Sequence, residues 1–81
     1  MEDQEAFEKG RQAACAALSG WQEMGYSSLE VCRTRLRRLA RYNLRQAEQA
    51  MAVAAPQWVP IWHKQVMFQQ GYLAALYREC C

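Results

Sequence analysis

Arginines crowd the middle of the chain and form its densest group of chemically active side chains. Six of them occupy about four helical turns, and no acidic residue lies between Glu30 and Glu48. Residues three and four positions apart share one side of a helix, so these guanidinium groups predict a basic face. We assign to this basic face Arg33, Arg37, Arg38, Arg41 and Arg45, with Arg35 beside them.

The basic face has three interpretations. Its arginines can pair with acidic side chains of the first helix or of a partner, bind an acidic protein or anionic lipid surface, or bind nucleic acid. The net charge is only +2, and no nucleic-acid-reading motif accompanies the cluster. We therefore expect no nucleic-acid partner.

Metal binding and catalysis find little support in the remaining reactive residues. His63 is the only histidine, and it would have to share a metal with Cys32, Cys80 or Cys81. In one helix His63 and Cys80 would lie roughly 25 Å apart. No phosphate loop, nucleophile motif or suitably spaced pair of carboxylates is present. We expect no enzyme activity, no metal and no cofactor.

The four cysteines form no CxxC pair, and the last two are adjacent. This spacing does not predict a disulfide framework. We interpret Cys15 and Cys32 as small buried apolar side chains that remain thiols in a reducing compartment.

Length and composition predict a single small helical domain over residues 1–81. Hydrophobic residues make up 52% of the chain, and only two prolines and four glycines interrupt it. Chains of this size have a small core and often rely on oligomerisation. The acidic start is unlike a signal peptide, and no run of 18 apolar residues occurs. We expect a cytoplasmic protein.

Apolar periodicity predicts three helices, at about residues 3–24, 28–55 and 60–79. We expect an all-α fold in which the long central helix forms an antiparallel hairpin with the C-terminal helix, and in which two chains form a homodimer. In the first helix the apolar stripe consists mostly of small residues, which allow another helix to approach closely: Gly10, Ala13, Ala14 and Ala17.

Local signals mark the helix ends. Gly25 predicts a left-handed cap after the first helix. Ser27 and Glu30 predict a capping box at the start of the second helix, with Tyr26 and Val31 as its hydrophobic staple. Pro56 ends the second helix, because residues before proline avoid the helical region.

The segment from Trp58 to Tyr77 carries more aromatic surface than so small a core needs. Phe68, Leu73 and Leu76 have a place against the central helix. The two tryptophans flank Pro60, where a three-helix chain offers least cover. We predict a partner-binding surface formed by Trp58, Ile61, Trp62, Val66 and Tyr72.

The stretch from Leu36 to Glu79 resembles the phasins, the coat proteins of polyhydroxyalkanoate granules. The resemblance lies in the helical run Leu39–Glu48, the proline-bearing break Ala55–Trp58 and the amphipathic helix that follows. It implies a helical protein whose apolar face covers a granule or a lipid surface.

Two functions therefore remain open. The first is a small regulatory binding protein that masks or sequesters a surface of a larger protein, such as a transcription regulator or an enzyme, through an apolar helical face. The alternative is a phasin-like protein on a granule or lipid surface.

Overall fold

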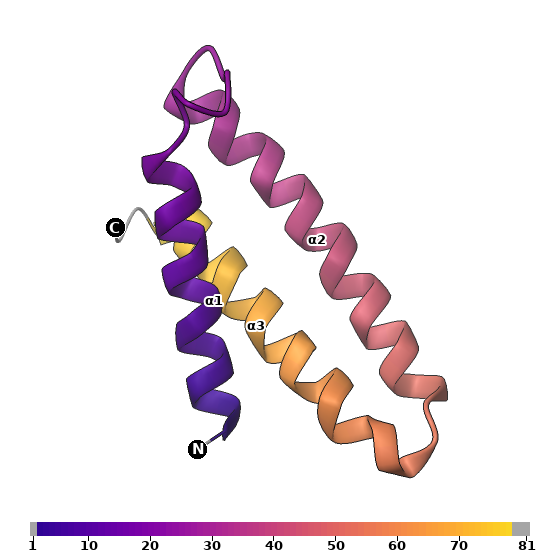
Figure 1. Cartoon of the computed structure of the whole chain (residues 1–81). Coiled ribbons are helices and arrows are strands. Elements are labelled where there is room, and N and C mark those ends of the chain that lie inside the picture. Colours follow the sequence, from indigo (N-terminus) through magenta and orange to yellow (C-terminus); the bar gives the residue numbers. More distant parts are fainter. Residues whose placement is uncertain (1, 79–81) are drawn as a thin grey trace.

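Three helices make up the computed structural model, which describes residues 2–78 (Figure 1). They are α1 (Glu2–Ser19), α2 (Leu29–Val53) and α3 (Val59–Arg78), with a short 3₁₀ turn, η1 (Pro56–Trp58), before α3. The molecule measures 43 × 23 × 19 Å, and α2 spans most of its long dimension. The predicted all-α fold is confirmed.

Helix α1 ends at Ser19, five residues before the predicted end. Gly20 follows it, and residues 20–25 form tight turns instead of regular helix. Gly25 nevertheless acts as the predicted left-handed cap, with a φ of 86°. The amide of Gly25 donates to the carbonyl of Gln22, and the amide of Tyr26 donates to that of Trp21. These two bonds form a Schellman motif, in which Gly25 is the left-handed residue that ends the turn.

Helix α2 begins one residue later than the predicted capping box requires. The cap is Ser28, whose hydroxyl accepts a hydrogen bond of 3.1 Å from the amide of Val31. Glu30 therefore falls one position short of the third helical residue, where a capping-box glutamate must lie. The capping box on Ser27 is wrong, and α2 starts at Leu29, one residue after the predicted start.

The connection between α2 and α3 follows from two prolines. Ala54 and Ala55 are extended, as expected before Pro56, so α2 ends at Val53 rather than at residue 55. Pro60 lies in the first turn of α3, where its missing N–H leaves no helical bond unmade. The predicted last residue of this helix, Glu79, lies outside the described residues.

Helix α3 is the central element and packs against both other helices, whereas α1 and α2 touch only slightly. Helices α2 and α3 form the predicted antiparallel hairpin (Figure 1). Helices α1 and α3 run in the same general direction where they cross, and their backbones approach closely at Gly10 and Gly71. The close approach predicted from the small residues of α1 is thus made by α3.

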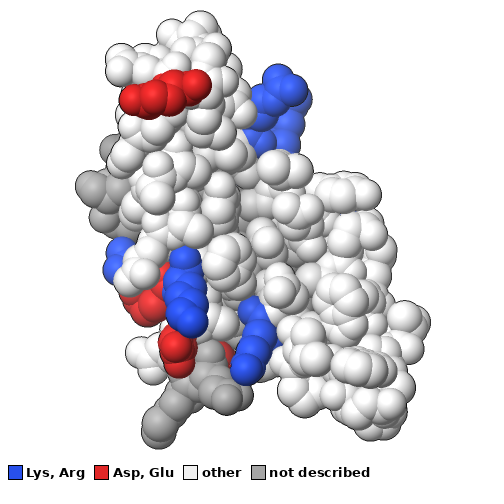
Figure 2. Space-filling view, viewed as in Figure 1, with Lys and Arg blue, Asp and Glu red and all other residues white. Residues whose placement is uncertain are grey.

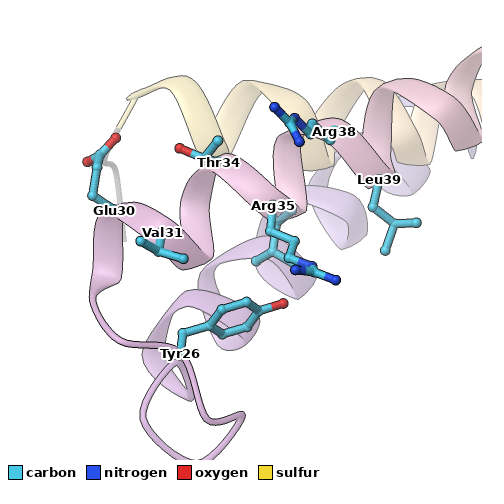
Figure 3. A pocket seen from close by; sticks show the side chains of 8 residues that line it. Tyr26, Glu30, Val31, Thr34, Arg35, Arg38 and Leu39 are labelled. Carbon is cyan, nitrogen blue, oxygen red and sulfur yellow. The ribbon is translucent and has the colours of Figure 1, made fainter.

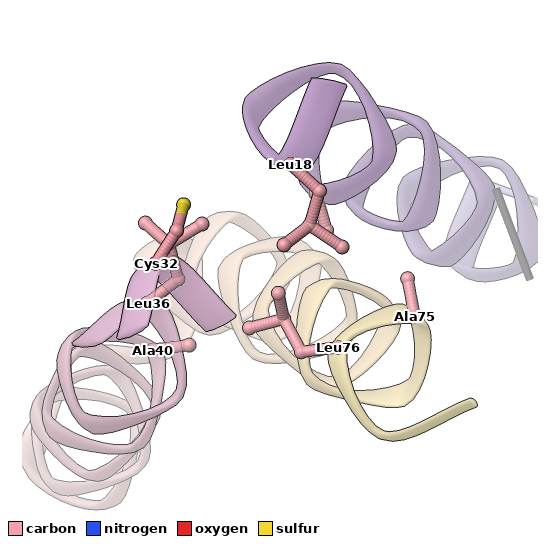
Figure 4. Close-up of a cluster of buried hydrophobic side chains, with 7 residues drawn as sticks. Leu18, Cys32, Leu36, Ala40, Ala75 and Leu76 are labelled. Carbon is pink, nitrogen blue, oxygen red and sulfur yellow. The ribbon is translucent and has the colours of Figure 1, made fainter. Parts of the chain in front are cut away.

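The core lies at the end of the molecule where all three helices meet (Figure 4). Trp21, Tyr26, Tyr72 and Leu73 pack around it, partly buried. Four of its seven buried side chains are alanine or cysteine, which allows the helices to lie close together. The buried members are Ala14, Leu18, Cys32, Leu36, Ala40, Ala75 and Leu76.

The two inner cysteines have different fates. Cys32 is a free, buried thiol, as predicted. Cys15 takes part in a disulfide, so the prediction that it stays a thiol is wrong. Spacing along the chain does not measure which side chains the packing of helices brings within bonding distance. Cys80 and Cys81 lie outside the described residues.

Candidate functional site

The end of the α2–α3 hairpin exposes large apolar side chains, and we call this surface the apolar tip. The exposed fractions are 86% for Val53, 53% for Trp58, 52% for Ile61 and 36% for Trp62. No charged residue lies between Glu48 and Lys64, and Figure 2 shows this end of the molecule, at the lower right, as uncharged. The tip therefore combines apolar area with an absence of charge.

The apolar tip is exposed because α1 does not reach it. The first turn of α1 meets α3 at the contact between Asp3 Oδ1 and His63 Nδ1, 3.0 Å apart. The α3 residues before His63, together with η1, extend past this point, where only α2 and α3 are present (Figure 1). A third helix that could cover Trp58 and Trp62 is missing there among the described elements.

Only part of the predicted partner-binding surface lies on the outside. Trp58, Ile61 and Trp62 fall together on the apolar tip. Val66 is 5% exposed, and Tyr72 packs against the core. Val66 and Tyr72 are therefore unavailable to a partner in this structure, because the close packing of helices encloses their side of α3. Sequence reasoning missed Val53, which lies off the buried side of α2 and is the most exposed large apolar residue of the tip.

The basic face divides between two environments. Arg33 is almost buried, and its Nη1 lies 3.3 Å from Glu30 Oε2, while Arg37 reaches the other Glu30 oxygen at 3.6 Å. Arg37 and Arg41 also lie over the ring of Tyr77, with guanidinium carbons 5.2 and 5.3 Å from its centroid. This side of α2 thus contacts α3 through the ring of Tyr77.

The remaining arginines point outwards. Arg35, Arg38 and Arg45 are exposed, and none of them forms an ion pair with another residue in the range 3–77, whose side chains the structure describes. Arg35 lies outside the residues assigned to the predicted basic face, and the structure shows it exposed on α2. These three arginines are able to meet an anionic partner.

Chain comparisons found no match. No family model, no curated protein and no solved structure matches this chain. The resemblance to phasins therefore stays a prediction.

The reactive side chains are dispersed. In the described part of the chain, no three His, Cys, Asp or Glu residues are grouped as a metal site would require. Over the same range, no helix has the length and apolarity needed to cross a membrane. His63 is half-exposed and is occupied by its contact with Asp3.

One buried group and one partly buried group resist ionisation. Burial raises the pKa of the Cys32 thiol, against a smaller opposite effect of the neighbouring Arg33 guanidinium. Burial also raises the pKa of the Tyr72 hydroxyl, and the nearby Cys32 and Tyr26 raise it further. Both groups are therefore neutral members of the core at physiological pH.

Proposed function

We propose that this chain is a non-enzymatic binding protein that masks an apolar pocket or groove of a larger protein with its apolar tip. The observation that carries the proposal is the exposure of Val53, Trp58, Ile61 and Trp62 on one uncharged end of a helical hairpin. Exposed apolar patches with large aromatic side chains are typical of protein interaction sites. A transcription regulator or an enzyme is the kind of target we expect, and we place the encounter in the cytoplasm.

The shape of the tip favours insertion into a concave partner. Two prolines fix its backbone, at Pro56 and Pro60, so little conformational freedom is lost when Trp58 and Trp62 are buried. Each tryptophan removes roughly 150–250 Å² from water when fully buried. Two such side chains are enough to anchor an interface in which the surrounding contacts mainly exclude water.

The test is affinity capture from the native cell with three forms of the chain. We expect wild type to retain a specific partner and Trp58→Ser/Trp62→Ser to lose it. Tyr42→Ser is the matched control, because Tyr42 is 61% exposed and lies on α2 away from the tip. Retention of the same partner by the tryptophan variant would contradict the proposal.

A second copy of this chain is the first alternative to a different protein as the partner of the apolar tip. The predicted homodimer would bury the tip against a second copy, and sedimentation measures this directly. A wild-type dimer that becomes a monomer in Trp58→Ser/Trp62→Ser would assign the tip to the twin chain.

A phasin-like role on a granule or lipid surface is the second candidate function. It is favoured by the two tryptophans on an uncharged end, because tryptophan is enriched where protein meets a lipid interface. Flotation with polyhydroxyalkanoate particles or phosphatidylcholine vesicles separates the two candidates. Co-migration of wild type, and its loss in the tryptophan variant, would support the surface role over protein masking.

A further inference from the structure

A groove lies at the opposite end of α2 from the apolar tip, between Tyr26 and the first three turns of the helix (Figure 3). Its volume is about 830 Å³. Side chains of both α2 and the preceding turn surround it. The lining residues are Tyr26, Glu30, Val31, Thr34, Arg35, Leu36, Arg38 and Leu39.

The turn before α2 builds one wall of this groove. The left-handed Gly25 and the bond from the Tyr26 amide to the Trp21 carbonyl direct the chain back towards α2. Tyr26 is partly buried against the core, so its position does not depend on a ligand. In Figure 3 its hydroxyl points towards Arg35. The groove is therefore preformed.

Positive charge on the groove is not neutralised within the described residues. Arg35 and Arg38 are exposed and form no ion pair with any residue from 3 to 77. The one acidic lining residue, Glu30, is already engaged by Arg33 and Arg37. An incoming carboxylate would thus meet two guanidinium groups and no competing free acid.

Apolar side chains lie beside these arginines. Val31 is 47% exposed and Leu39 is 56% exposed, so both offer apolar area to a partner. With Arg35 between them, they lie one and two turns apart on the same side of α2. An amphipathic helix that carries leucines on one side and acidic residues beside them complements this pattern.

We propose that this groove binds an acidic amphipathic helix of a partner protein. The apolar residues of that helix cover Val31 and Leu39, and its carboxylates pair with Arg35 and Arg38. The concave shape and the Tyr26 wall favour a helix over a flat lipid surface. The inference is independent of the apolar tip, because the two surfaces occupy opposite ends of α2.

The probe is a fluorescein-labelled synthetic helix of 18 residues, with leucine along one side and glutamate elsewhere, titrated against the full chain by fluorescence anisotropy. We expect saturable binding that weakens as salt is raised. Arg35→Glu/Arg38→Glu should weaken it at least 10-fold, and Leu39→Ala about 10-fold. Arg45→Glu is the matched control, since Arg45 is an exposed arginine of α2 outside the groove, and it should change affinity less than threefold.

Circular dichroism and the unfolding midpoint should stay at wild-type values in all these variants, because every altered side chain is exposed. Three results would overturn the proposal. The first is no binding of the probe to wild type, and the second is an equal loss of affinity in Arg45→Glu. The third is arginine-dependent binding of phosphatidylserine vesicles without binding of the helix, which would assign the groove to lipid.

Discussion

Gly10 of α1 and Gly71 of α3 occupy equivalent places in the crossing of these helices. A Cβ atom on Gly10 would lie 1.9 Å from the carbonyl oxygen of Phe68, and one on Gly71 would lie 1.9 Å from that of Phe7. Gly10 thus lies against the carbonyl of Phe68, three residues before Gly71. Gly71 lies in the same way against the carbonyl of Phe7, three residues before Gly10. The two backbones approach so closely that no larger residue fits at either position, and this crossing sets where α1 lies.

Gly10→Ala and Gly71→Ala should each destabilise the fold by about 2 kcal/mol or more. The added methyl group overlaps with backbone, which cannot move aside as a side chain can. This cost exceeds the gain of about 1 kcal/mol in helix propensity. Guanidinium unfolding followed by circular dichroism measures the change.

Gly20→Ala is the control for these variants. A Cβ on Gly20 would meet only ordinary contacts, the nearest at 3.8 Å. We expect its free energy of unfolding to stay within about 0.5 kcal/mol of wild type. Wild-type stability in Gly10→Ala would show that α1 does not cross α3 at this point.

Ser28→Ala should cost about 1 kcal/mol, because it removes the hydroxyl that accepts the amide of Val31 at the start of α2. Ser27→Ala, one residue earlier, should be nearly neutral. Thermal unfolding of the two variants side by side distinguishes the observed cap from the capping box predicted on Ser27. If Ser27→Ala were instead the less stable of the two variants, the capping box on Ser27 would be supported.

Two apolar residues of α3 should respond very differently to truncation. Val66→Ala should destabilise the fold by about 2 kcal/mol, because Val66 is buried. Ile61→Ala should cost under about 0.5 kcal/mol, because Ile61 lies half-exposed on the apolar tip. Chemical unfolding at several protein concentrations measures both. A large cost for Ile61→Ala that grows with concentration would mean that a second copy covers the tip.

Tyr77 should couple energetically to Arg41. The guanidinium lies over the exposed ring, a geometry worth about 0.5–1 kcal/mol at the surface. A double-mutant cycle of Arg41→Gln and Tyr77→Leu, measured by urea unfolding, yields the coupling. The cycle of Arg45→Gln with Tyr77→Leu serves as the control and should show none, since no contact joins Arg45 to that ring.

Alkaline pH should destabilise the protein through its buried acids. The folded state raises the pKa values of Cys32 and Tyr72, so the unfolded chain releases these protons first. The contribution of these two groups to the free energy of unfolding is therefore complete below the ordinary thiol pKa of 9.0. It falls as pH rises through and beyond that value. Urea unfolding from pH 7 to 10.5 should show this decline.

Cys32→Ala and Tyr72→Phe provide the comparison for the pH series. Each variant lacks one of the two titrating groups, so each should lose part of the alkaline decline even where it is less stable overall. A decline identical to wild type in both variants would assign the effect to other groups.

Much of the fold could be predicted from local sequence. The apolar period gives three helices, Gly25 and Pro56 mark where they are interrupted, and the two tryptophans flank Pro60 at the junction of η1 and α3. These features depend on backbone conformation and on residues close in the chain, which the sequence states directly. The exposure of Trp58 and Trp62 follows from them, because a helix start beside a proline-bearing connection has few neighbours.

Tertiary structure alone decided which helix covers which. Periodicity shows that Gly10 and Ala14 share one side of α1, but it does not show that the partner is α3, crossing through Gly71. That choice encloses Val66 and Tyr72, which the sequence had placed on the binding surface. The physical reason is that packing depends on how closely two backbones can approach and on how the connecting turns direct them, and neither is a property of one helix alone.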